Sequence, residues 1–562
     1  MKRFKALTAL ILIASMLFSI AACSEDSGKK RKERKKHKEE ETEETEETEE
    51  TEETEKPDET EPAETEEPDV TESVPDETEP DVTEPTAVPT PGVRDDSILI
   101  EVVRDWDYGD FEKDSNYIFV SGLSVADVSE KDYPLLKKAL MEYFSDNDEN
   151  ELFALMDELK GDTDPSGSYL QNVPCVKRSD ATVFSITNNW YFSSYDPQIN
   201  RTYLRGATFD SLTGRRFTIS DITLDKDALA EKLSDAFGRK LTPADINDLE
   251  KSGDLAWFIT PETIVFALNS NPEAGTVCLP LDNTKGTGEG IFDIYTGKAD
   301  YILPFYDQVD FYSDGYGVSV DTEGTGELDH IVICENRPAD DDYYYVDSYD
   351  INYGDFEYRL EVPSLGCSPY LLKVNGFSMI LLEITMDGDY TETYTLLLSP
   401  ELGVVPADHV RGNIGGPLES FTPEGAEAVR RGCEPTDTGA LYLTKKTDIF
   451  GTFTTYYPVY IDTDGSVTVI TNLGTADTSW WPKPLVTKTD FKVSDVTTGE
   501  EVVLPKGTAL KIVMADGDMG RVIFETEDGT WYDAYLDNPE SYPQTVDGVD
   551  ANDIFEDMYY AG

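Results

Sequence analysis

Residues 206–222 have the sequence GATFDSLTGRRFTISDI, which runs from a strand through a turn toward a helix. Asp210 and Gly214 bound the turn, and Gly214 lies where the backbone needs a positive φ. The residues after Gly214 predict a returning strand that leads to a helix at about residue 226. The stretch therefore predicts an αβ segment with a tight turn at its centre.

Three amphipathic helices are predicted around this stretch. The first begins at a capping-box-like sequence, residues 129–132, the second runs over 151–160 and closes at Gly161, and the third covers 226–240. Apolar faces of this kind more often pack into a core than bind a ligand. The apolar positions are Tyr133, Leu136, Leu140 and Phe144 in the first, Leu152, Leu155, Met156 and Leu159 in the second, and Leu229, Leu233 and Phe237 in the third.

After about residue 290 the helical period gives way to short apolar strands separated by turns. The predicted strands are 343–346, 371–374, 379–382 and 394–398, and the predicted turns are Asn375-Gly376, Asp387-Gly388 and Asp464-Gly465. The predicted fold class is an α+β N-terminal ectodomain followed by mostly β domains, with a disordered N-terminal stalk.

Four blocks in order, residues 176–186 (VKRSDATVFSI), 206–222, 257–266 (WFITPETIVF) and 275–280 (GTVCLP), resemble the RsiV-type extracytoplasmic domain. That domain also precedes PdaC-type peptidoglycan deacetylase modules. The resemblance spans residues 98–285 and implies an α+β domain that binds or senses a wall-associated ligand, which is lysozyme for the best-known member.

The chain departs from this family in two ways. Family members often carry a Gly-Gly-Ala-His segment between the first two blocks, whereas residues 195–202 here read YDPQINRT. An anti-sigma factor also needs a cytoplasmic arm and a membrane span. A chain anchored by lipid on Cys23 has neither, so lipidation would exclude direct control of a sigma factor.

The N-terminus predicts export and lipidation. Lys2, Arg3 and Lys5 precede an apolar run, 6–22, that is too short for a convincing span. The run ends in Ile-Ala-Ala-Cys23, which resembles the bacterial lipobox, so Cys23 would carry diacylglycerol with acyl chains such as palmitate. The alternative is ordinary cleavage with Cys23 as a bystander. We expect a lipid-anchored protein on the extracytoplasmic face of a bacterial cell membrane.

Residues 29–38 are basic and 39–91 are Thr-Glu repeats that grade into Pro-Asp-Glu-Thr repeats. The basic block would lie against anionic lipid headgroups or remain a solvated charge run. The repeats have almost no apolar side chain to bury, which predicts a disordered stalk.

Composition and motifs exclude several function classes. A net charge of −68, from 114 acidic and 46 basic residues, repels nucleic acid, so no DNA or RNA partner is expected. The six cysteines form no Cys-x-x-Cys pair, only three histidines occur, and a Gly-x-Ser-x-Gly motif is absent. We therefore predict no catalytic residue, no metal and no cofactor.

Residues 321–329 imitate a calcium loop, with oxygen side chains at four of its ligand positions and a glycine at the sixth. Its twelfth position is Val332, where a bidentate glutamate is needed, so a plain β-turn is favoured. His330 and His409 are isolated among hydrophobic and turn residues.

Residues 504–513 and 522–532 are similar to bacterial SH3-like wall modules, and an unrelated small barrel is the alternative. Aromatic clusters at 190–192, 343–345, 456–457 and 480–482 favour core packing, with glycan or protein binding as the alternative.

The predicted organisation is a signal peptide (1–22), a stalk (23–95), an RsiV-like α+β domain (96–290), a β-rich domain (291–485) and a small β domain, SH3-like in one interpretation (486–562). The predicted function is non-catalytic binding of a cell-wall-associated ligand, either peptidoglycan or a basic protein such as lysozyme. The alternatives are an envelope hydrolase or wall-modifying enzyme and a structural or accessory lipoprotein.

Overall fold

The computed structural model describes residues 100–562 apart from 114–115, 147–148, 162–166, 196–197, 282–289, 295, 308–314, 339–344, 387–389, 422–428, 479–482, 540, 557 and 561–562. The predicted signal peptide, Cys23 and the stalk over 23–95 lie outside the described residues. Strands dominate the described chain, and strand residues outnumber helical ones even before residue 290. The chain is therefore mostly β, and the α+β class predicted for its N-terminal part is not clearly shown.

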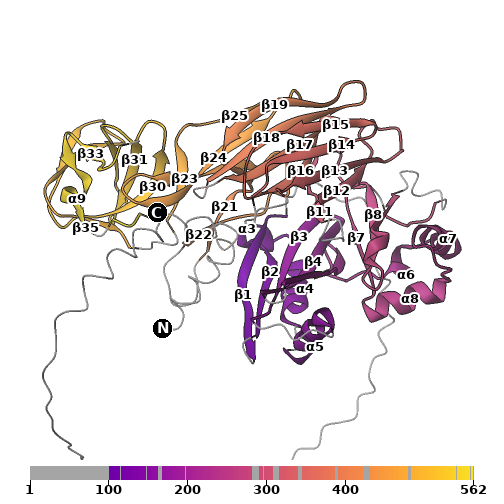
Figure 1. Ribbon diagram of the computed structural model, residues 1–562. Coiled ribbons are helices and arrows are strands. Elements are labelled where there is room, and N and C mark those ends of the chain that lie inside the picture. Colours follow the sequence, from indigo (N-terminus) through magenta and orange to yellow (C-terminus); the bar gives the residue numbers. More distant parts are fainter. Residues whose placement is uncertain are drawn as a thin grey trace, which may run out of the picture. The chain divides into compact units, whose positions relative to one another are not determined.

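A six-stranded sheet opens the described chain in the order β1-β2-β3-β4-β5, with β6 also paired to β4 (Figure 1). Strands β2 and β3 are parallel, and the helices α3, α4 and α5 connect them. These elements are β1 (Val102–Lys113), β2 (Asn116–Val125), α3 (Asp127–Glu130), α4 (Pro134–Ser145), α5 (Glu149–Lys160), β3 (Tyr169–Ser179), β4 (Val183–Tyr195), β5 (Gln198–Tyr203) and β6 (Gly206–Asp210).

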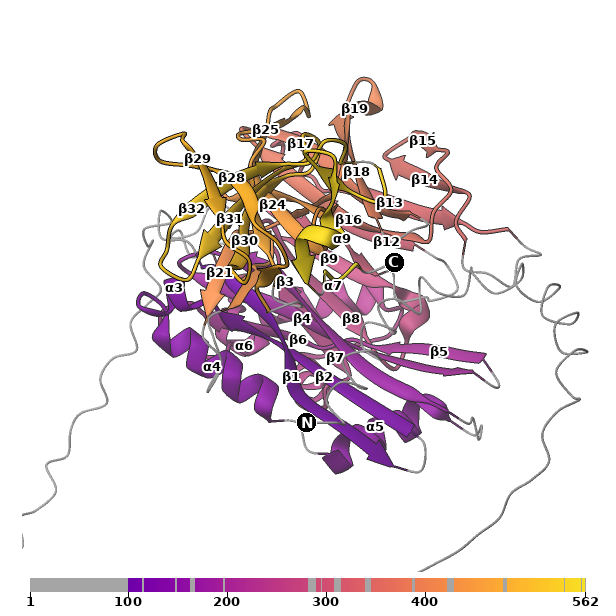
Figure 2. The same ribbon diagram turned by 90° about the vertical axis from the view of Figure 1, so that its left-hand side faces the viewer.

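The helix faces predicted from the sequence pack against this sheet. Leu136, Leu140 and Phe144 of α4 are fully buried against β2, β4 and β6, and the apolar face of α5 packs on β2, β3 and β4. Figure 2 shows α4 and α5 running along the sheet. Burial on this scale stabilises the fold by about 2 kcal/mol for each leucine.

The predicted start of the first helix is wrong. Ser129 lies within α3, where its hydroxyl accepts a hydrogen bond from the backbone N–H of Glu101. The hydroxyl therefore does not cap α4, which begins at Pro134 after Tyr133. Proline is favoured at the first helical position because it has no N–H to leave unpaired.

A three-stranded sheet in the order β7-β8-β9 follows, and three helices pack on it around one apolar cluster. The predicted third helix ends early, at Ala236, because Gly238 takes a φ of +61°. Helix α8, which the sequence analysis missed, follows it. The elements are α6 (Ile219–Ile222), α7 (Lys226–Ala236), α8 (Pro243–Ser252), β7 (Leu255–Ile259), β8 (Thr263–Leu268), a 3₁₀ turn (Pro272–Ala274) and β9 (Thr276–Pro280).

Two antiparallel five-stranded sheets then share one apolar core. The predicted turn at Asn375-Gly376 is confirmed, with φ of 50° and 81° at the two residues. The predicted turn at Asp387-Gly388 and residues 343–344 of the predicted 343–346 strand lie outside the described residues, and Val346 forms an isolated bridge with Ser364. The sheets contain β10 (Tyr301–Pro304), β16 (Gly366–Val374), β17 (Phe377–Met386), β18 (Tyr390–Ser399) and β19 (Gly403–Arg411), and β11 (Tyr306–Asp307), β12 (Gly315–Val320), β13 (Asp329–Asn336), β14 (Ser348–Tyr353) and β15 (Phe356–Leu360).

A twelve-stranded antiparallel sheet accounts for most of the remaining chain and continues on both sides of residue 485. The predicted domain boundaries, including the one at 485, stay predictions. The sheet contains β20 (Asn413–Gly415), β23 (Leu441–Asp448), β24 (Thr452–Ile461), β25 (Val467–Val469), β26 (Gly474–Asp477), β27 (Leu485–Thr487), β28 (Phe491–Asp495), β29 (Glu501–Leu504), β30 (Ala509–Asp516), β31 (Arg521–Thr526), β32 (Trp531–Tyr535) and β35 (Phe555–Glu556). Two short hairpins, β21 (Leu418–Phe421) with β22 (Val429–Gly432) and β33 (Thr545–Val546) with β34 (Val549–Asp550), and helix α9 (Ala551–Ile554) complete the described elements.

Candidate functional site

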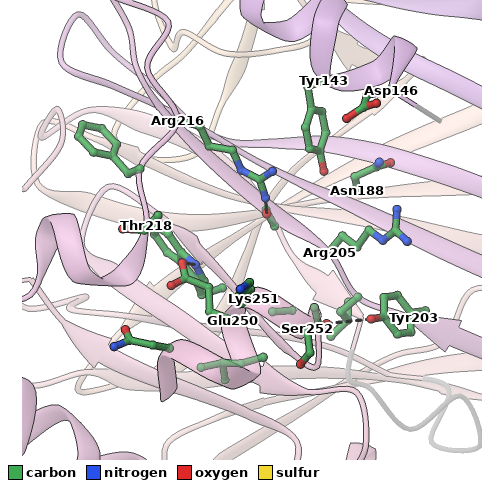
Figure 3. A pocket seen from close by; sticks show the side chains of 18 of the residues that line it. Tyr143, Asp146, Asn188, Tyr203, Arg205, Arg216, Thr218, Glu250, Lys251 and Ser252 are labelled. Atoms are coloured by element: carbon green, nitrogen blue, oxygen red, sulfur yellow. Dashed lines mark hydrogen bonds between the residues drawn. The ribbon is translucent and has the colours of Figure 1, made fainter. Parts of the chain in front are cut away.

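A cleft of about 900 Å³ opens between the six-stranded sheet and the layer formed by α6 to α8 (Figure 3). Its walls come from the end of α4, from β4 and the segment joining β5 to β6, from residues 216–220, and from α8 and β7. Volumes of this size accommodate a ligand of several sugar or amino-acid units. The cleft is the candidate functional site.

The floor of the cleft is fixed by a close approach of two strands. A Cβ atom added to Gly206 of β6 would lie 1.8 Å from the carbonyl oxygen of Trp257 on β7. The Asn269 side chain bridges the same two sheets, because it accepts from Leu204 N at 2.8 Å and donates to Leu204 O at 2.9 Å. These contacts hold the two walls together without a ligand, so the cleft is preformed.

Arg216 follows the turn of the 206–222 stretch and reaches into the cleft. Its guanidinium lies over the ring of Tyr143, 5.3 Å from the centroid, and one Nη donates to the carbonyl of Gly206 at 3.3 Å. Figure 3 shows the Arg216 head group and the Tyr143 hydroxyl turned toward the same central space. An aromatic face and one carbonyl thus orient this cation.

Arg205 approaches the cleft from the segment between β5 and β6. Its guanidinium lies 5.8 Å from the ring of Trp190 and 5.5 Å from the ring of Tyr203. The Tyr203 hydroxyl donates to the carbonyl of Gly253 at 2.8 Å, which fixes its ring. Aromatic faces therefore also hold the second arginine.

Neither cleft arginine forms an ion pair with any carboxylate among the residues that the structure describes. Arg215, one residue away, pairs with Asp221 at 3.1 Å, and Arg359 pairs with Asp350 at 2.7 Å. Such pairs are expected in a chain with 114 acidic and 46 basic residues. The cleft arginines keep N–H groups available for a bound anion.

Asn188 of β4 adds a buried amide to the same opening. Only 3% of this residue is exposed, and its Oδ1 accepts from Nδ2 of Asn172 at 2.7 Å. Its own side-chain N–H groups have no hydrogen-bond partner within the described part of the chain, and the residue lines the cleft (Figure 3). A buried amide with open donors is a site for a ligand acceptor or a water.

Glu250 of α8 is the cleft carboxylate whose structural role is clearest. Its Oε1 accepts from the backbone N–H of Ile219 at 2.8 Å and from the indole N–H of Trp257 at 2.9 Å. Burial raises the pKa of this carboxyl above its usual range, although both hydrogen bonds and the Arg216 charge act to lower it. Glu250 joins α8 to α6 and β7, and Asp146, Glu151 and Lys251 complete the charged lining.

The 321–329 loop, which resembles a calcium site in sequence, is stabilised by hydrogen bonds between its own residues. Both oxygens of the Asp321 carboxylate are used, by Thr325 N at 2.9 Å and Gly326 N at 2.7 Å, and Asp329 accepts from Thr322. Among the described residues, no group of three or more histidine, cysteine or acidic side chains is arranged to hold a metal ion.

His330 and His409, the two histidines among the described residues, lie on different strands and away from the cleft. His330 of β13 hydrogen-bonds Ser319 at 3.0 Å, and burial lowers the pKa of its ring. His409 of β19 stacks on Tyr394 with ring centroids 4.2 Å apart and lies 2.9 Å from a carboxylate oxygen of Glu392. The structure brings neither histidine to the cleft lining.

Core packing is confirmed for several predicted aromatic residues. Trp190, Phe192 and Tyr457 are buried. The clusters at 343–344 and 480–481 lie outside the described residues, as does the lipidation site Cys23. The sequence analysis missed the cleft, although two basic residues, Arg205 and Arg216, flank the strand and turn with which it began.

No helix among the described residues is both long enough and apolar enough to cross a membrane. The chain matches no family model and no curated protein. Among solved structures it is similar to a DUF3298 family member from Bacteroides fragilis, at 10% identity and a TM-score of 0.22, over 34% of this chain and 94% of that one. Membership of the RsiV-type family remains a prediction.

Proposed function

We propose that the chain is an extracytoplasmic bacterial lipoprotein, anchored through Cys23, that binds a cell-wall-associated glycan in the cleft without turning it over. In this proposal residues 98–285 form an α+β domain of the RsiV type, and the stalk carries that domain away from the membrane. The observation that supports it is the preformed cleft, whose lining combines Tyr143, Tyr203 and Asn188 with two arginines that have no ion-pair partner among the described residues. Sugars are bound by this combination of ring faces and planar hydrogen-bonding groups.

The test is calorimetry with the full chain in detergent, titrated with solubilised peptidoglycan at low and at physiological salt. Saturable binding is expected, and Tyr143→Ala should weaken it because the ring forms a wall of the cleft and supports Arg216. Tyr460→Ala is the matched control, since that tyrosine is 46% exposed on β24 and does not line the cleft. Equal loss in both variants, or no binding by the wild-type chain, would contradict the proposal.

A basic protein such as lysozyme is the second candidate ligand, and the excess of acidic over basic residues favours it. Association driven by opposite net charge is steered over long distances and weakens steeply with salt. Titration of the full chain with hen-type lysozyme separates the two ligands. Lysozyme binding through the acidic surface should fall at physiological salt and should be insensitive to Tyr143→Ala.

The enzyme alternative is favoured by one observation, the raised pKa of Glu250 in a cleft that also contains Asp146 and Glu151. A protonated carboxyl beside a carboxylate is the arrangement of many glycosidases. The two donors on Glu250 Oε1 support a structural role instead. Turnover of peptidoglycan fragments that disappears in Glu250→Gln, with binding retained, would establish the hydrolase.

A further inference from the structure

We propose that Arg216, Arg205 and Asn188 form a subsite for a single carboxylate, and that the bound glycan is an acidic sugar of the N-acetylmuramic type. The inference rests on the proposed function, because it names the group on the glycan that the cleft recognises. It makes the cleft selective for carboxylate-bearing wall fragments over neutral chitin-like oligosaccharides.

Charge placement is the first argument. Acidic residues outnumber basic ones by 114 to 46 in this chain, yet neither cleft arginine pairs with a carboxylate among the described residues. Guanidinium groups bind carboxylates through two parallel N–H bonds, which makes an arginine that lacks a carboxylate partner in the fold a natural receptor for such a group.

Preorganisation is the second argument. Tyr143 and the Gly206 carbonyl hold Arg216, while Trp190 and Tyr203 hold Arg205. Both cations are therefore positioned before a ligand arrives, and little side-chain entropy is lost when one binds. The fixed floor at Gly206 and Trp257 keeps the two arginines on walls that do not separate.

The buried amide of Asn188 is the third argument. Its Oδ1 accepts from Asn172 and the residue lines the cleft, so in this proposal the Nδ2 of the same amide is the donor to the ligand. The residue is 3% exposed, and among the described residues no acceptor takes its side-chain N–H groups. A ligand oxygen beside the arginines would satisfy it.

The acidic part of the lining selects the kind of anion. Asp146, Glu151 and Glu250 line the same cleft as Arg205, Arg216 and Lys251. A polymer with a phosphate on every unit would place further negative charge beside these carboxylates, which disfavours it. One carboxylate on an otherwise neutral glycan adds a single negative charge, which the two arginines can take up.

The experiment titrates the full chain in detergent with four probes. They are the N-acetylglucosaminyl-N-acetylmuramic acid disaccharide, its methyl ester, N,N′-diacetylchitobiose and a glycerol phosphate oligomer. The free acid should bind about 10- to 100-fold more tightly than the ester or chitobiose, which is the effect expected for a charge-assisted bidentate hydrogen bond.

Variants then locate the selectivity. Arg216→Gln and Arg205→Gln should each remove most of the preference for the free acid, because each should weaken binding of the free acid far more than binding of chitobiose. The matched control is Arg215→Gln, which removes a neighbouring arginine that pairs with Asp221 outside the cleft lining, and it should keep the full preference.

The outcomes separate the two proposals. Equal binding of the free acid, ester and chitobiose would overturn the carboxylate subsite and leave glycan binding intact. Tighter binding of the phosphate oligomer than of the muramyl acid would overturn the carboxylate subsite in favour of a phosphate polymer. Absence of binding by every glycan probe would overturn the proposed function and the subsite with it. The probe comparison uses the wild-type chain, so it decides the matter even if a variant fails to fold.

Discussion

Replacing Glu383 by glutamine is expected to stabilise the protein near neutral pH and to remove a pH dependence of its unfolding. Glu383 lies on β17, is 7% exposed, and accepts a hydrogen bond from the backbone N–H of Ile414 on β20. Burial raises the pKa of its carboxyl to about 8, with the nearby Glu434 adding to the effect and the Ile414 bond opposing it. Glu434 itself is paired with Arg104 at 2.9 Å.

The sign follows from proton counting. Between its ordinary pKa of 4.5 and about 8, the folded chain keeps a proton on Glu383 that the unfolded chain has released. The free energy of unfolding is therefore highest below about pH 4.5. It falls by about 1.4 kcal/mol per pH unit as the pH rises from there toward 8. Keeping Glu383 protonated in the folded chain thus lowers the free energy of unfolding by about 3 kcal/mol at pH 7 and by about 1 kcal/mol at pH 5.

Glutamine has the shape of the protonated acid, carries no charge at any pH, and still offers an oxygen to Ile414 N. The assay is urea-induced unfolding of the full chain at several pH values, followed by circular dichroism. The stability gain of Glu383→Gln should grow from about 1 kcal/mol at pH 5 to about 3 kcal/mol at pH 7. Glu357→Gln on β15 is the control, because Glu357 is exposed.

Parallel pH profiles for the wild-type chain and Glu383→Gln would refute this reasoning, since they would mean that Glu383 releases its proton in both states at similar pH. A loss of stability at every pH would instead show that the carboxylate itself is required at this position. Only a difference that widens with pH fits a buried neutral carboxyl.

Two further predictions come from the structure and one comes from the sequence. Leu140→Ala should lower the free energy of unfolding by about 2–5 kcal/mol, because Leu140 is fully buried, whereas Met141→Ala, at a residue 50% exposed, should change it by less than about 0.5 kcal/mol in the same urea titration. Gly206→Ala should lower the thermal midpoint and weaken glycan binding, because the added Cβ meets the Trp257 carbonyl. The free energy of unfolding should fall by at least about 1–3 kcal/mol. Gly415→Ala is the control and should have neither effect, since the nearest atom to its added Cβ lies at 3.5 Å. Cys23→Ser should move the protein from the membrane fraction to the soluble extracytoplasmic fraction in a cell fractionation blot, and its retention on the membrane would contradict lipid anchoring.

Local patterns predicted those parts of the fold that short-range chemistry determines. The turn after β6 forms as expected, because Asp210 Oδ1 accepts from Leu212 N and Thr213 N while Gly214 takes a φ of +66°. The Asn375-Gly376 hairpin likewise depends on residues that tolerate positive φ. Each of these features involves atoms only a few residues apart.

Helix α8 was missed although its signal is present in the sequence. Thr242 and Asp245 form a reciprocal capping box, Pro243 occupies the first helical position, and Gly253 ends the helix with a φ of +79°. One side chain, Ile246, is fully buried, so the apolar periodicity on which the prediction relied is weak here. The caps, rather than the periodicity, identify this helix.

The candidate site could not be predicted from periodicity, because distant contacts build it. Gly206 touches Trp257, and Leu204 bonds Asn269 across 65 positions of sequence. Elsewhere in the described chain, the ion pair of Arg104 with Glu434 spans 330 positions of sequence. Neither the register of two sheets nor the partner of a buried cation can be inferred from spacing in one strand.

The arginines of this chain differ in the groups that hold their side chains. Arg104 and Arg178 are buried and pair with Glu434 and Asp180, so their charges are already balanced within the fold. Arg205 and Arg216 are oriented by aromatic rings, which position a cation without neutralising it. In so acidic a chain, carboxylate partners are abundant, and neither Arg205 nor Arg216 forms an ion pair with one among the described residues; the proposed carboxylate subsite rests on that contrast.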